Sequence, residues 1–386
     1  MSVTGEQTNL AVEIPERAWP RVKVAFTGPR TTGFLEEADR PLQRGEVRYR
    51  TLFSGISAGT ELTMYRDTNP YLHKRWDDEQ RLFVSDPRHE SSEYPVAAGY
   101  EEIGEVVEVG PGVRNLPLGS RVYGTWGHRT IHIGTAAHAR QHILPPDVDP
   151  LYGIFSHIGA IALNGVLDAG IRLGETVAVF GLGVVGQLVA RLAKLSGAEV
   201  IGVDFIPLRL EAARRLGIDA ALDAGAGSAA EQIKRLTSGR GADVCIEASG
   251  SAGALHEAIR AAAYSSKVVA LGFFQGGAQA LLLGEEFHHN RINVVCSQIS
   301  GLAPELQHRW DRARLVRTFM ALAAQGKVDL PSLITHLLPA AEAPRLFRLL
   351  DEHPAEVLQA VLDFREGIPA SLVTPLADQA VPPAAV

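Results

Sequence analysis

The spacing of apolar residues changes about 165 residues into the chain. Between about 20 and 150, apolar and polar residues alternate among many glycines and prolines, which predicts short β-strands. From about 165 onward, short apolar runs are separated by stretches of helical period. Beyond about 300, amphipathic helical segments lead to a short strand near 357–363. The last stretch, 369–386, is rich in Ala and Pro, and we expect a loose tail because it has little to bury.

The alternation in the second half predicts a parallel, doubly wound sheet with helices on both faces. The predicted strands are Thr176–Phe180, Glu199–Val203, Val244–Glu247, Lys267–Leu271 and Asn293–Gln298. Predicted helices between them include Leu208–Leu216 and Ala254–Ala263. The fold class is therefore α/β, with a β-rich domain preceding the parallel-sheet domain.

One glycine-rich turn stands where a dinucleotide site needs it. Gly181, Gly183 and Gly186 have G-x-G-x-x-G spacing between the first predicted strand and a helical stretch. The first glycine allows the tight turn, the second lets a pyrophosphate approach the backbone, and the third lets helix and strand pack closely. The free N–H groups at the start of the helix, at Val184 and Val185, would then meet the pyrophosphate. The alternative is a purely structural strand–helix turn.

The second predicted strand ends in an acid, Asp204, which lies 18 residues after Gly186. A carboxylate there can accept hydrogen bonds from the adenosine ribose and repels a 2′-phosphate, so the sequence favours NAD(H) over NADP(H). Arg209 lies close by in sequence, so NADP(H) remains an alternative cofactor. Loops after strand ends line the cofactor crevice. By that rule three further residues are expected in the cofactor site: Ser249, Gly272 and Phe273.

Composition describes an ordinary globular protein of 386 residues, with 46% hydrophobic and 21% charged residues. Its net charge of −7 argues against nucleic acid or an acidic membrane surface as partner. We expect a cytoplasmic protein, because no apolar run approaches the ~20 residues of a membrane span and the N-terminus lacks a signal pattern. Cys245 and Cys296 stand in apolar runs and are expected to be buried, inert thiols.

Short motifs in a fixed order resemble the medium-chain dehydrogenase/reductase superfamily, the zinc alcohol dehydrogenase-like proteins. They are GISAGTE at 55–61, GYE at 99–101, GEVVEVG at 104–110, GSRV at 119–122 and the glycine turn. The resemblance covers about 20–365. It implies a GroES-like catalytic domain over 1–152, a Rossmann domain over 153–298, and a return to the catalytic domain over 299–365. The active site is expected in the cleft between the two domains.

The sequence departs from this family where its zinc-dependent members bind the metal. Their ligand positions, a Cys in G-I-C, a His in G-H-E and a Cys or acid before the Rossmann domain, fall on Ser57, Tyr100 and His157. A serine hydroxyl and a phenol of pKa about 10 are poor zinc ligands. Glu101 and His157 remain as ligands, and two are too few for a tight site. The four-cysteine lobe of the family is also absent, so we predict no metal.

Without zinc, a side chain must handle the proton that accompanies hydride transfer. Tyr100 and His157 are the first candidates, and the alternative is that they merely fill the space of the metal. Thr60 matches the family hydroxyl near the nicotinamide ribose and can pass a proton. Glu101, like Glu61, either orients these groups or has structural value only. Ser57 is included in the site, as a spacer rather than a nucleophile.

Two further features are open to more than one interpretation. His128 follows a small-residue turn and either faces the cleft or is structural. The stretch between Arg66 and Tyr94 is longer than the link usual in the family, and its charges balance. Because it joins two active-site motifs, we expect it to shape the substrate pocket or act as a lid. The alternative is a surface excursion or a subunit contact.

The sequence thus predicts an NAD(H)-dependent, zinc-independent alcohol dehydrogenase or ketone reductase acting on a small molecule. A secondary alcohol is expected, such as a sugar, cyclitol or secondary-metabolite intermediate. One alternative is a zinc-free quinone or enone reductase, for which NADPH would be typical. Another is a non-catalytic nucleotide-binding protein. The resemblance also implies a homodimer that pairs the last Rossmann strand, Ile292–Gln298, with its twin.

Overall fold

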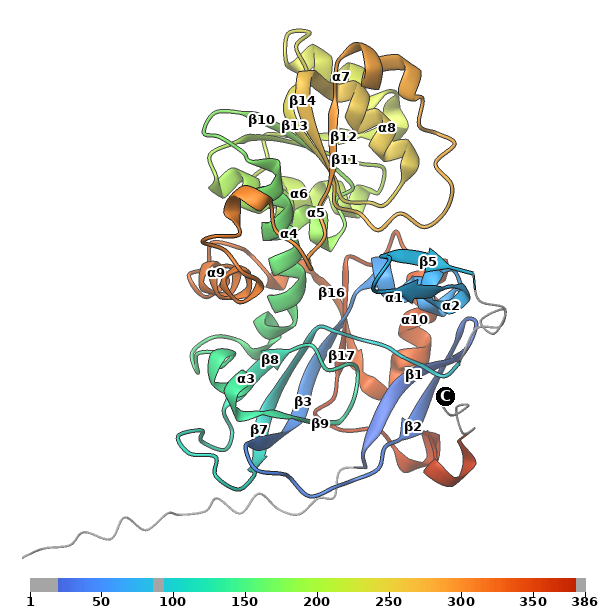
Figure 1. Ribbon diagram of the computed structural model, residues 1–386, viewed down its shortest axis with the longest axis vertical. Coiled ribbons are helices and arrows are strands. Elements are labelled where there is room, and N and C mark those ends of the chain that lie inside the picture. The colour runs from blue at the N-terminus through green and yellow to red at the C-terminus, as the bar shows by residue number, and fades with distance from the viewer. Residues whose placement is uncertain (1–19, 86–93, 380–386) are drawn as a thin grey trace, which may run out of the picture.

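The computed structural model describes residues 20–85 and 94–379. Two parts are stacked along the long axis of the molecule (Figure 1). The lower part is built from both ends of the chain and is rich in β-structure. The upper part is a parallel sheet with helices on its faces, and the long helix α4 (Ser156–Ala169) runs between the two.

The lower part contains two sheets. A four-stranded sheet has the order β18-β2-β1-β6, and a second has the order β16-β17-β3-β7-β8 with β9 also pairing β3. The strands from the first half of the chain are β1 (Val22–Gly28), β2 (Thr31–Glu36), β3 (Glu46–Ile56), β6 (Val96–Ala97), β7 (Glu102–Val109), β8 (Arg121–Gly124) and β9 (Ile131–Thr135). Strand β3 is buried throughout its second half, which explains why its alternation fades into a continuous apolar run.

The C-terminal part of the chain completes these sheets. Its strands are β16 (Ile334–Pro339), β17 (Gln359–Asp363) and β18 (Val373–Thr374). Strand β17 pairs antiparallel with β3, and helix α10 (Ala343–Glu352) buries Phe347 against Phe26 with ring centroids 5.0 Å apart. The short helices α1 (Ala58–Tyr65) and α3 (Ala136–Gln141) belong to the same part.

The upper part is a six-stranded parallel sheet of order β12-β11-β10-β13-β14-β15. Its strands are β10 (Thr176–Phe180), β11 (Glu199–Asp204), β12 (Ala220–Asp223), β13 (Ala242–Glu247), β14 (Ala262–Ala270) and β15 (Asn293–Cys296). Its helices are α5 (Val184–Leu195), α6 (Pro207–Arg215), α7 (Ala229–Leu236) and α8 (Ala252–Ala261). The strand order reverses beside β10, which places a ligand crevice at the carboxyl ends of β10 and β13. This arrangement confirms the predicted fold class.

Helix α4 and α9 (Arg312–Ala324) form the support between the two parts. A Cβ on Gly159 of α4 would lie 2.2 Å from the Phe319 ring of α9, so the two helices are packed in direct contact there. The stretch Pro150–Ala169 is apolar and long enough to cross a membrane, but 67% of it is buried inside this structure. Burial on this scale is typical of a core helix.

Three expectations need correction. The part of the expected loose tail that lies within the described residues, 369–379, is instead paired: β18 adds to β2 in parallel, and Gln379 Nε2 donates to the Glu36 carbonyl at 2.8 Å. Cys245 is buried, but Cys296 is exposed because β15 is the edge strand of its sheet in this chain. Strand β12 was not predicted, since Ala220–Asp223 is too short to show a period.

Candidate active site

The three glycines of the turn after β10 have distinct surroundings. Gly181 has φ +86°, a left-handed conformation that glycine adopts at low cost. A Cβ on Gly186 would lie 1.8 Å from the Gly181 carbonyl oxygen, so only glycine fits there. A Cβ on Gly183 would meet nothing within 4 Å. The turn therefore leaves open space beside Gly183, at the start of α5, where backbone N–H groups can receive a phosphate.

Asp204 ends β11 and lies beside this turn. Its carboxylate accepts hydrogen bonds from the backbone N–H groups of Leu182 at 2.7 Å, Phe205 at 2.8 Å and Ile206 at 2.9 Å. The Arg209 guanidinium lies 3.7 Å from the same carboxylate. The site thus offers both an acid for ribose hydroxyls and a cation next to it.

Phe205 is a site residue that the sequence reasoning missed. It follows Asp204 directly and is 70% exposed, although large apolar side chains are usually covered. An exposed ring beside the ribose position offers a flat apolar surface of the kind on which a purine stacks. The signal was present in the sequence, as an aromatic residue immediately after the acid that ends the second strand.

The loops after β13 and β14 meet the glycine turn from the other side. A Cβ on Gly181 would lie 2.6 Å from the Ser249 side chain, and a Cβ on Gly272 would lie 2.1 Å from the Gly250 nitrogen. Buried Glu247 fixes this corner, because its carboxylate accepts from the Ser249 N–H at 2.7 Å. Phe273 is 42% exposed next to it. The structure therefore brings the predicted residues Ser249, Gly272 and Phe273 to the same crevice.

The candidate catalytic residues come together in the lower part of the cleft. Ser57 is the N-cap of α1, yet its hydroxyl does not cap the helix and instead accepts a hydrogen bond from the Tyr100 phenol. The Thr60 hydroxyl interacts with the same phenol. The His157 ring, on α4, meets the Tyr100 ring edge-on with centroids 5.2 Å apart. The start of α1 and helix α4 thus converge on the phenol that the turn before β7 carries.

The protonation of this group follows from its surroundings. Burial raises the pKa of Tyr100, and the nearby Glu101 and Glu61 carboxylates raise it further. Burial, with the charge of Arg312, lowers the pKa of His157 to about 4. His157 Nδ1 lies 3.2 Å from Arg312 Nη2, and a guanidinium can only donate, so the neutral ring carries its proton on Nε2. Near neutral pH the resting site therefore holds a protonated phenol and an uncharged imidazole.

Glu101 is fully buried behind Tyr100. Burial raises its pKa well above the ordinary value, and the carboxylates of Glu61 and Glu102 add to this effect. Gln359 Nε2 on β17 lies 3.4 Å from one carboxyl oxygen, while the other oxygen has no hydrogen-bond partner among the described residues. Glu101 is thus placed to act on Tyr100 electrostatically, and the C-terminal return supplies its polar neighbour.

His128 does not face the cleft. Its side chain is fully buried, with Nε2 2.8 Å from a Glu61 carboxylate oxygen and Nδ1 2.6 Å from the Ser54 hydroxyl. The Ser54 hydroxyl in turn donates to Glu102 at 3.0 Å. Ser54 and Glu102 were missed by the sequence reasoning, because no local pattern signals a contact between residues 74 positions apart.

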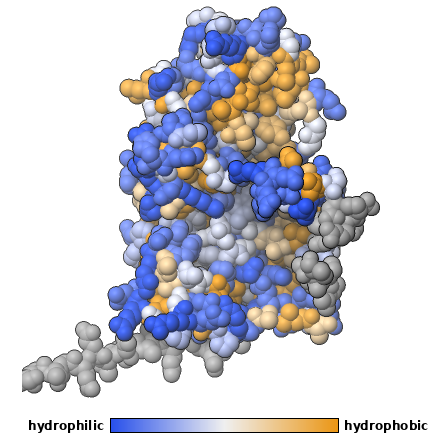
Figure 2. Space-filling view, in the orientation of Figure 1, coloured by the Kyte–Doolittle hydropathy of each residue, from blue (hydrophilic) through white to orange (hydrophobic). Residues whose placement is uncertain are grey.

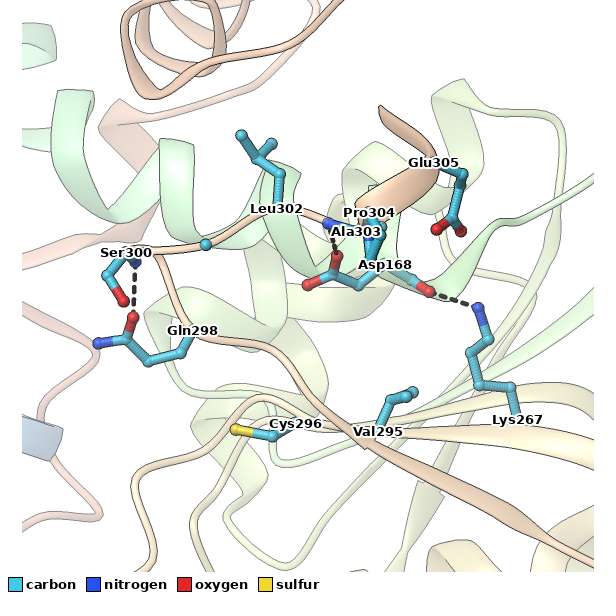
Figure 3. A pocket seen from close by; sticks show the side chains of 11 residues that line it. Asp168, Lys267, Val295, Cys296, Gln298, Ser300, Leu302, Ala303, Pro304 and Glu305 are labelled. Carbon is cyan, nitrogen blue, oxygen red and sulfur yellow. Dashed lines mark hydrogen bonds between the residues drawn. The ribbon is translucent and has the colours of Figure 1, made fainter. Parts of the chain in front are cut away.

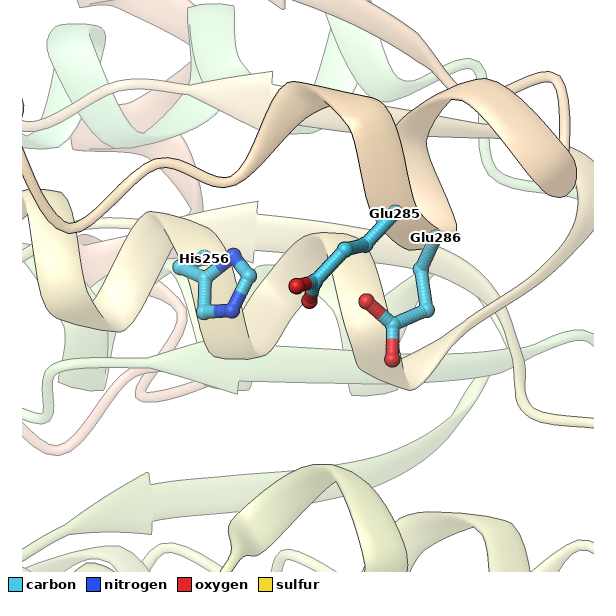
Figure 4. A group of neighbouring side chains, drawn as sticks. All are labelled: His256, Glu285 and Glu286. Atoms are coloured by element: carbon cyan, nitrogen blue, oxygen red, sulfur yellow. The ribbon is translucent and has the colours of Figure 1, made fainter.

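At two of the three positions where the sequence comparison leads us to expect zinc ligands, the donor atoms are the Ser57 hydroxyl and the Tyr100 phenol, which bond to each other. The phenol is also held in its protonated form, whereas zinc prefers thiolate, imidazole and carboxylate ligands. Within 20–85 and 94–379, the group of ligand-type side chains close enough to share an ion lies elsewhere, at His256, Glu285 and Glu286 (Figure 4). Glu286 there is paired with Arg260 at 3.3 Å.

A cavity of about 320 Å³ opens beside the edge strand β15 (Figure 3). Asp168, Lys267 and Cys296 are among the residues that line it, together with the loop up to Glu305. Lys267 Nζ donates to the Asp168 carbonyl at 2.6 Å. None of the predicted catalytic or cofactor residues lines this cavity.

The long connection from Arg66 to Tyr94 forms helix α2 (Pro70–His73) and a hairpin of β4 (Arg75–Asp77) and β5 (Leu82–Val84). Residues 86–93 of it lie outside the described residues. The hairpin lies at the level where the two parts meet, and its surface is largely hydrophilic (Figures 1 and 2). Thr68 Oγ1 donates to Gln275 of the loop after β14 at 3.3 Å, and Gln275 Nε2 donates to the Gly59 carbonyl at 3.0 Å. The insertion is therefore tied to both sides of the cleft.

Comparison with known proteins identifies the family. The D-guloside 3-dehydrogenase of Escherichia coli (strain K12) is 30% identical over 351 residues, covering 89% of this chain and 99% of the relative. The chain belongs to the zinc-binding dehydrogenase family. The family profile of that description matches residues 184–314. The protein is thus an alcohol dehydrogenase-like, medium-chain oxidoreductase that acts on CH–OH donors.

Solved structures of this dehydrogenase fold include nucleotide complexes. A short chain alcohol dehydrogenase from E. coli CFT073, complexed with NADH, has a TM-score of 0.70 and 20% identity, covering 89% of this chain and 99% of its own. A zinc-binding dehydrogenase from Sinorhizobium meliloti 1021, bound to NADP, has a TM-score of 0.70 and 22% identity with the same coverage. At this identity the likeness establishes the fold. The two neighbours differ in cofactor, so the choice between NAD and NADP needs its own argument.

Proposed function

We propose that this dehydrogenase moves a hydride between NAD(H) and a secondary hydroxyl carbon of a sugar or glycoside, without a catalytic zinc. The observation that carries the proposal is the Tyr100 phenol, held by Ser57 and Thr60 where the family's zinc ligands would stand. A bound nicotinamide would supply or accept the hydride. The chain's own residues would supply the proton.

The proposed substrate class rests on the substrate named for a relative and on the polar residues at the start of the insertion. The D-guloside 3-dehydrogenase is named for oxidation at a ring carbon of a sugar derivative, and it aligns over nearly all of its length. In this chain the segment between α1 and α2, at the start of the insertion, is joined to the loop after β14 through Thr68 and Gln275. Hydrogen-bonding groups of this kind discriminate well between substrates with and without hydroxyls.

The absence of zinc is inferred from the donor set. Ser57 and Tyr100 replace a thiolate and an imidazole, and the burial of Tyr100 disfavours the ionised phenolate that a metal would require. At or next to the family's zinc-ligand positions, only His157 and Glu101 have side chains of a type that binds zinc. His157 Nδ1 is already engaged with Arg312. These residues do not fit a tight zinc site.

The preference for NAD(H) rests on Asp204. Its carboxylate is fixed by three backbone N–H groups at the end of β11, where it would repel a 2′-phosphate. Arg209 partly offsets that charge, and it supports the competing interpretation of an NADPH-dependent quinone or enone reductase. Cofactor preference therefore separates the two functions.

Tyr100 is the proton donor and acceptor in this proposal. In the reductive direction the phenol donates to the carbonyl oxygen as the hydride arrives, and Thr60 and Ser57 hold it in place. In the oxidative direction the phenol first passes its proton through the Ser57 and Thr60 hydroxyls to water, and the phenolate then accepts the proton of the substrate hydroxyl. The positive charge of a bound oxidised nicotinamide would favour the phenolate. His157 presents its Nε2–H as a further donor for the reacting oxygen.

A homodimer and a cytoplasmic location stay predictions. Strand β15 is an edge strand with Val294 36% exposed, and Leu282 and Leu283 before it are also exposed. The face in view in Figure 2 carries a hydrophobic patch in this upper part, bordered by hydrophilic residues. An apolar strand edge of this kind is a ready site for pairing with a second copy.

The test is an activity measurement on the purified protein with Tyr100→Phe beside it. We expect turnover of sugar or glycoside substrates with NAD(H), no loss on treatment with a chelator, and less than stoichiometric zinc by metal analysis. Tyr100→Phe should lower kcat by about 10²-fold or more, because it removes the acid–base group. The control is Tyr264→Phe at an exposed position, which should keep full activity.

Three outcomes would contradict this proposal. Stoichiometric zinc whose removal abolishes activity would restore the metal mechanism. Strong selectivity for NADPH with enone substrates would favour the reductase alternative. Tight NAD(H) binding without turnover on a broad panel of alcohols and ketones would indicate a nucleotide-binding protein.

A further inference from the structure

We propose that His128 is a positioning residue of the active site. Together with Glu61, Ser54 and Glu102 it forms a buried polar chain, named here the His128 chain, that holds Ser57 and Tyr100 in register. Its effect on catalysis rests on the proposed role of Tyr100. Its geometry stands independently of that role.

The His128 chain is continuous from Ser57 into the sheet. The Ser57 backbone N–H donates to one Glu61 carboxylate oxygen at 2.8 Å, and His128 Nε2 lies 2.8 Å from the other. His128 Nδ1 lies 2.6 Å from the Ser54 hydroxyl, which donates to Glu102 at 3.0 Å. Glu102 also accepts from the backbone N–H of residue 126 at 2.6 Å. Every link is therefore fixed at both ends.

His128 also contacts the segment that carries Tyr100. Its backbone N–H donates to the Ala98 carbonyl at 2.9 Å. Gly99 has φ +95°, and a Cβ there would lie 2.6 Å from His128 Nδ1, so the backbone before Tyr100 rests directly on the imidazole. One ring thus touches the Gly99–Tyr100 segment and, through Glu61, the amide of Ser57. Its position sets the distance between the two hydroxyls.

The burial of these charged groups indicates that the His128 chain does more than fill space in the core. The side chains of His128 and Glu102 are fully buried, and that of Glu61 is 4% exposed. Burying charged groups is costly, and apolar residues of similar volume would fill the space without that cost. Directional hydrogen bonds give what apolar packing does not, a fixed orientation of the Ser57 amide.

The charges around the imidazole determine its protonation. Burial alone lowers the pKa of His128, but the carboxylates of Glu61 and Glu102 outweigh this and raise the pKa, against the opposing charge of Arg129. Burial raises the pKa of Glu102. The imidazolium is therefore the favoured form over a wider pH range than for a free histidine. The imidazolium lies against the Glu61 carboxylate, which itself raises the pKa of Tyr100, so the charge on His128 bears on the phenol through Glu61.

The experiment compares His128→Asn with His142→Asn, a histidine whose Nδ1 bonds to the His138 carbonyl and not to this chain. We expect His128→Asn to lower kcat by about 10²-fold, the loss typical of a misplacement of about 1 Å. The Kd for NADH, measured by fluorescence, should change little. The variant leaves the Glu61 carboxylate without the imidazolium beside it, and this carboxylate raises the pKa of Tyr100, so the limb of the kcat–pH profile that reports Tyr100 should move to higher pH. His142→Asn should leave the profile in place.

A readout without turnover separates this inference from the proposed function. Amide hydrogen exchange at Ser57 should accelerate in His128→Asn and stay unchanged in His142→Asn, because Glu61 loses its second partner. If the wild-type protein turns over no substrate but this change is seen, the His128 chain stands and the proposed function fails. Should His128→Asn fail to fold, Ser54→Ala cuts the link to Glu102 and should give a smaller change of the same sign. Unchanged kcat, pH profile and Ser57 exchange in the variant that folds would overturn the proposal.

Discussion

At the scale of the residue, two glycines of the cofactor turn have different roles, one in packing and one in leaving space for a ligand. The G-x-G-x-x-G spacing alone does not show which glycine has which role. Gly186 is required by packing, because its Cβ position coincides with the Gly181 carbonyl, whereas Gly183 borders empty space in the free protein. The helix start at Gly183 is also free of any side-chain cap. Stability and ligand binding therefore depend on different glycines three residues apart.

Substituting each glycine by alanine tests this separation. Gly186→Ala should destabilise the fold by about 1–3 kcal/mol, as overpacking does, and lower the melting temperature. Gly183→Ala should leave the melting temperature of the free protein unchanged, since φ is −63° and no atom is near, yet weaken NADH binding at least tenfold. Thermal melts and fluorescence titrations of the same samples check both. Equal NADH affinity in Gly183→Ala and wild type would show that no phosphate approaches this backbone.

At the scale of the element, the insertion is joined to the loop after β14 rather than standing free. Gln275 receives a hydrogen bond from Thr68 and donates one to the Gly59 carbonyl, so a single amide joins the start of the insertion, α1 and the loop after β14. The same loop carries Gly272 and Phe273. We therefore expect that binding of a nicotinamide cofactor beside this loop changes how firmly the insertion is held.

Gln275→Ala should release this connection. Two hydrogen bonds of about 1 kcal/mol each are lost, so limited proteolysis between residues 66 and 94 should become several-fold faster in the presence of NADH. The KM for substrate should rise more than kcat falls, since the chemistry itself is untouched. Gln279→Ala in the same loop is the matched control. If both variants are cut at the wild-type rate, the insertion is not held by this bridge.

At the scale of the whole molecule, β15 is one of the two edge strands of the parallel sheet and carries exposed apolar side chains. Val294 and Cys296 are exposed on this four-residue strand, and a second copy would cover both. A closed two-fold dimer would extend the sheet across the interface and remove its exposed edge.

Val294→Lys tests this assembly, because a buried lysine opposite its own twin is strongly unfavourable. We expect the wild-type protein to be dimeric by light scattering and the variant to be largely monomeric. Leu236→Lys, at an exposed position on α7, should leave the dimer intact. A monomeric wild type at micromolar concentration would rule the assembly out.

Much of the fold could be predicted from the sequence, because period and glycine chemistry are local. Apart from β12, the strands from Thr176 to Cys296 and the glycine turn follow from residues within one strand–turn–helix unit. The exposure of Cys296 could not be predicted, since it depends on which strand lies at the sheet edge. The His128 chain was equally hidden, because Glu61 and His128 are 67 residues apart and their contact exists only once two sheets have formed.

The pairing of β17 with β3 has a consequence for how the protein is made. Residues 359–363 complete a sheet begun at residue 46, so the catalytic half stays unfinished until nearly the whole chain has left the ribosome. The nucleotide-binding half consists of consecutive residues and can fold while synthesis continues. A truncated chain that ends before residue 359 would therefore be able to bind nucleotide but would lack the Gln359 amide behind Glu101. Such a product would bind the cofactor without being active.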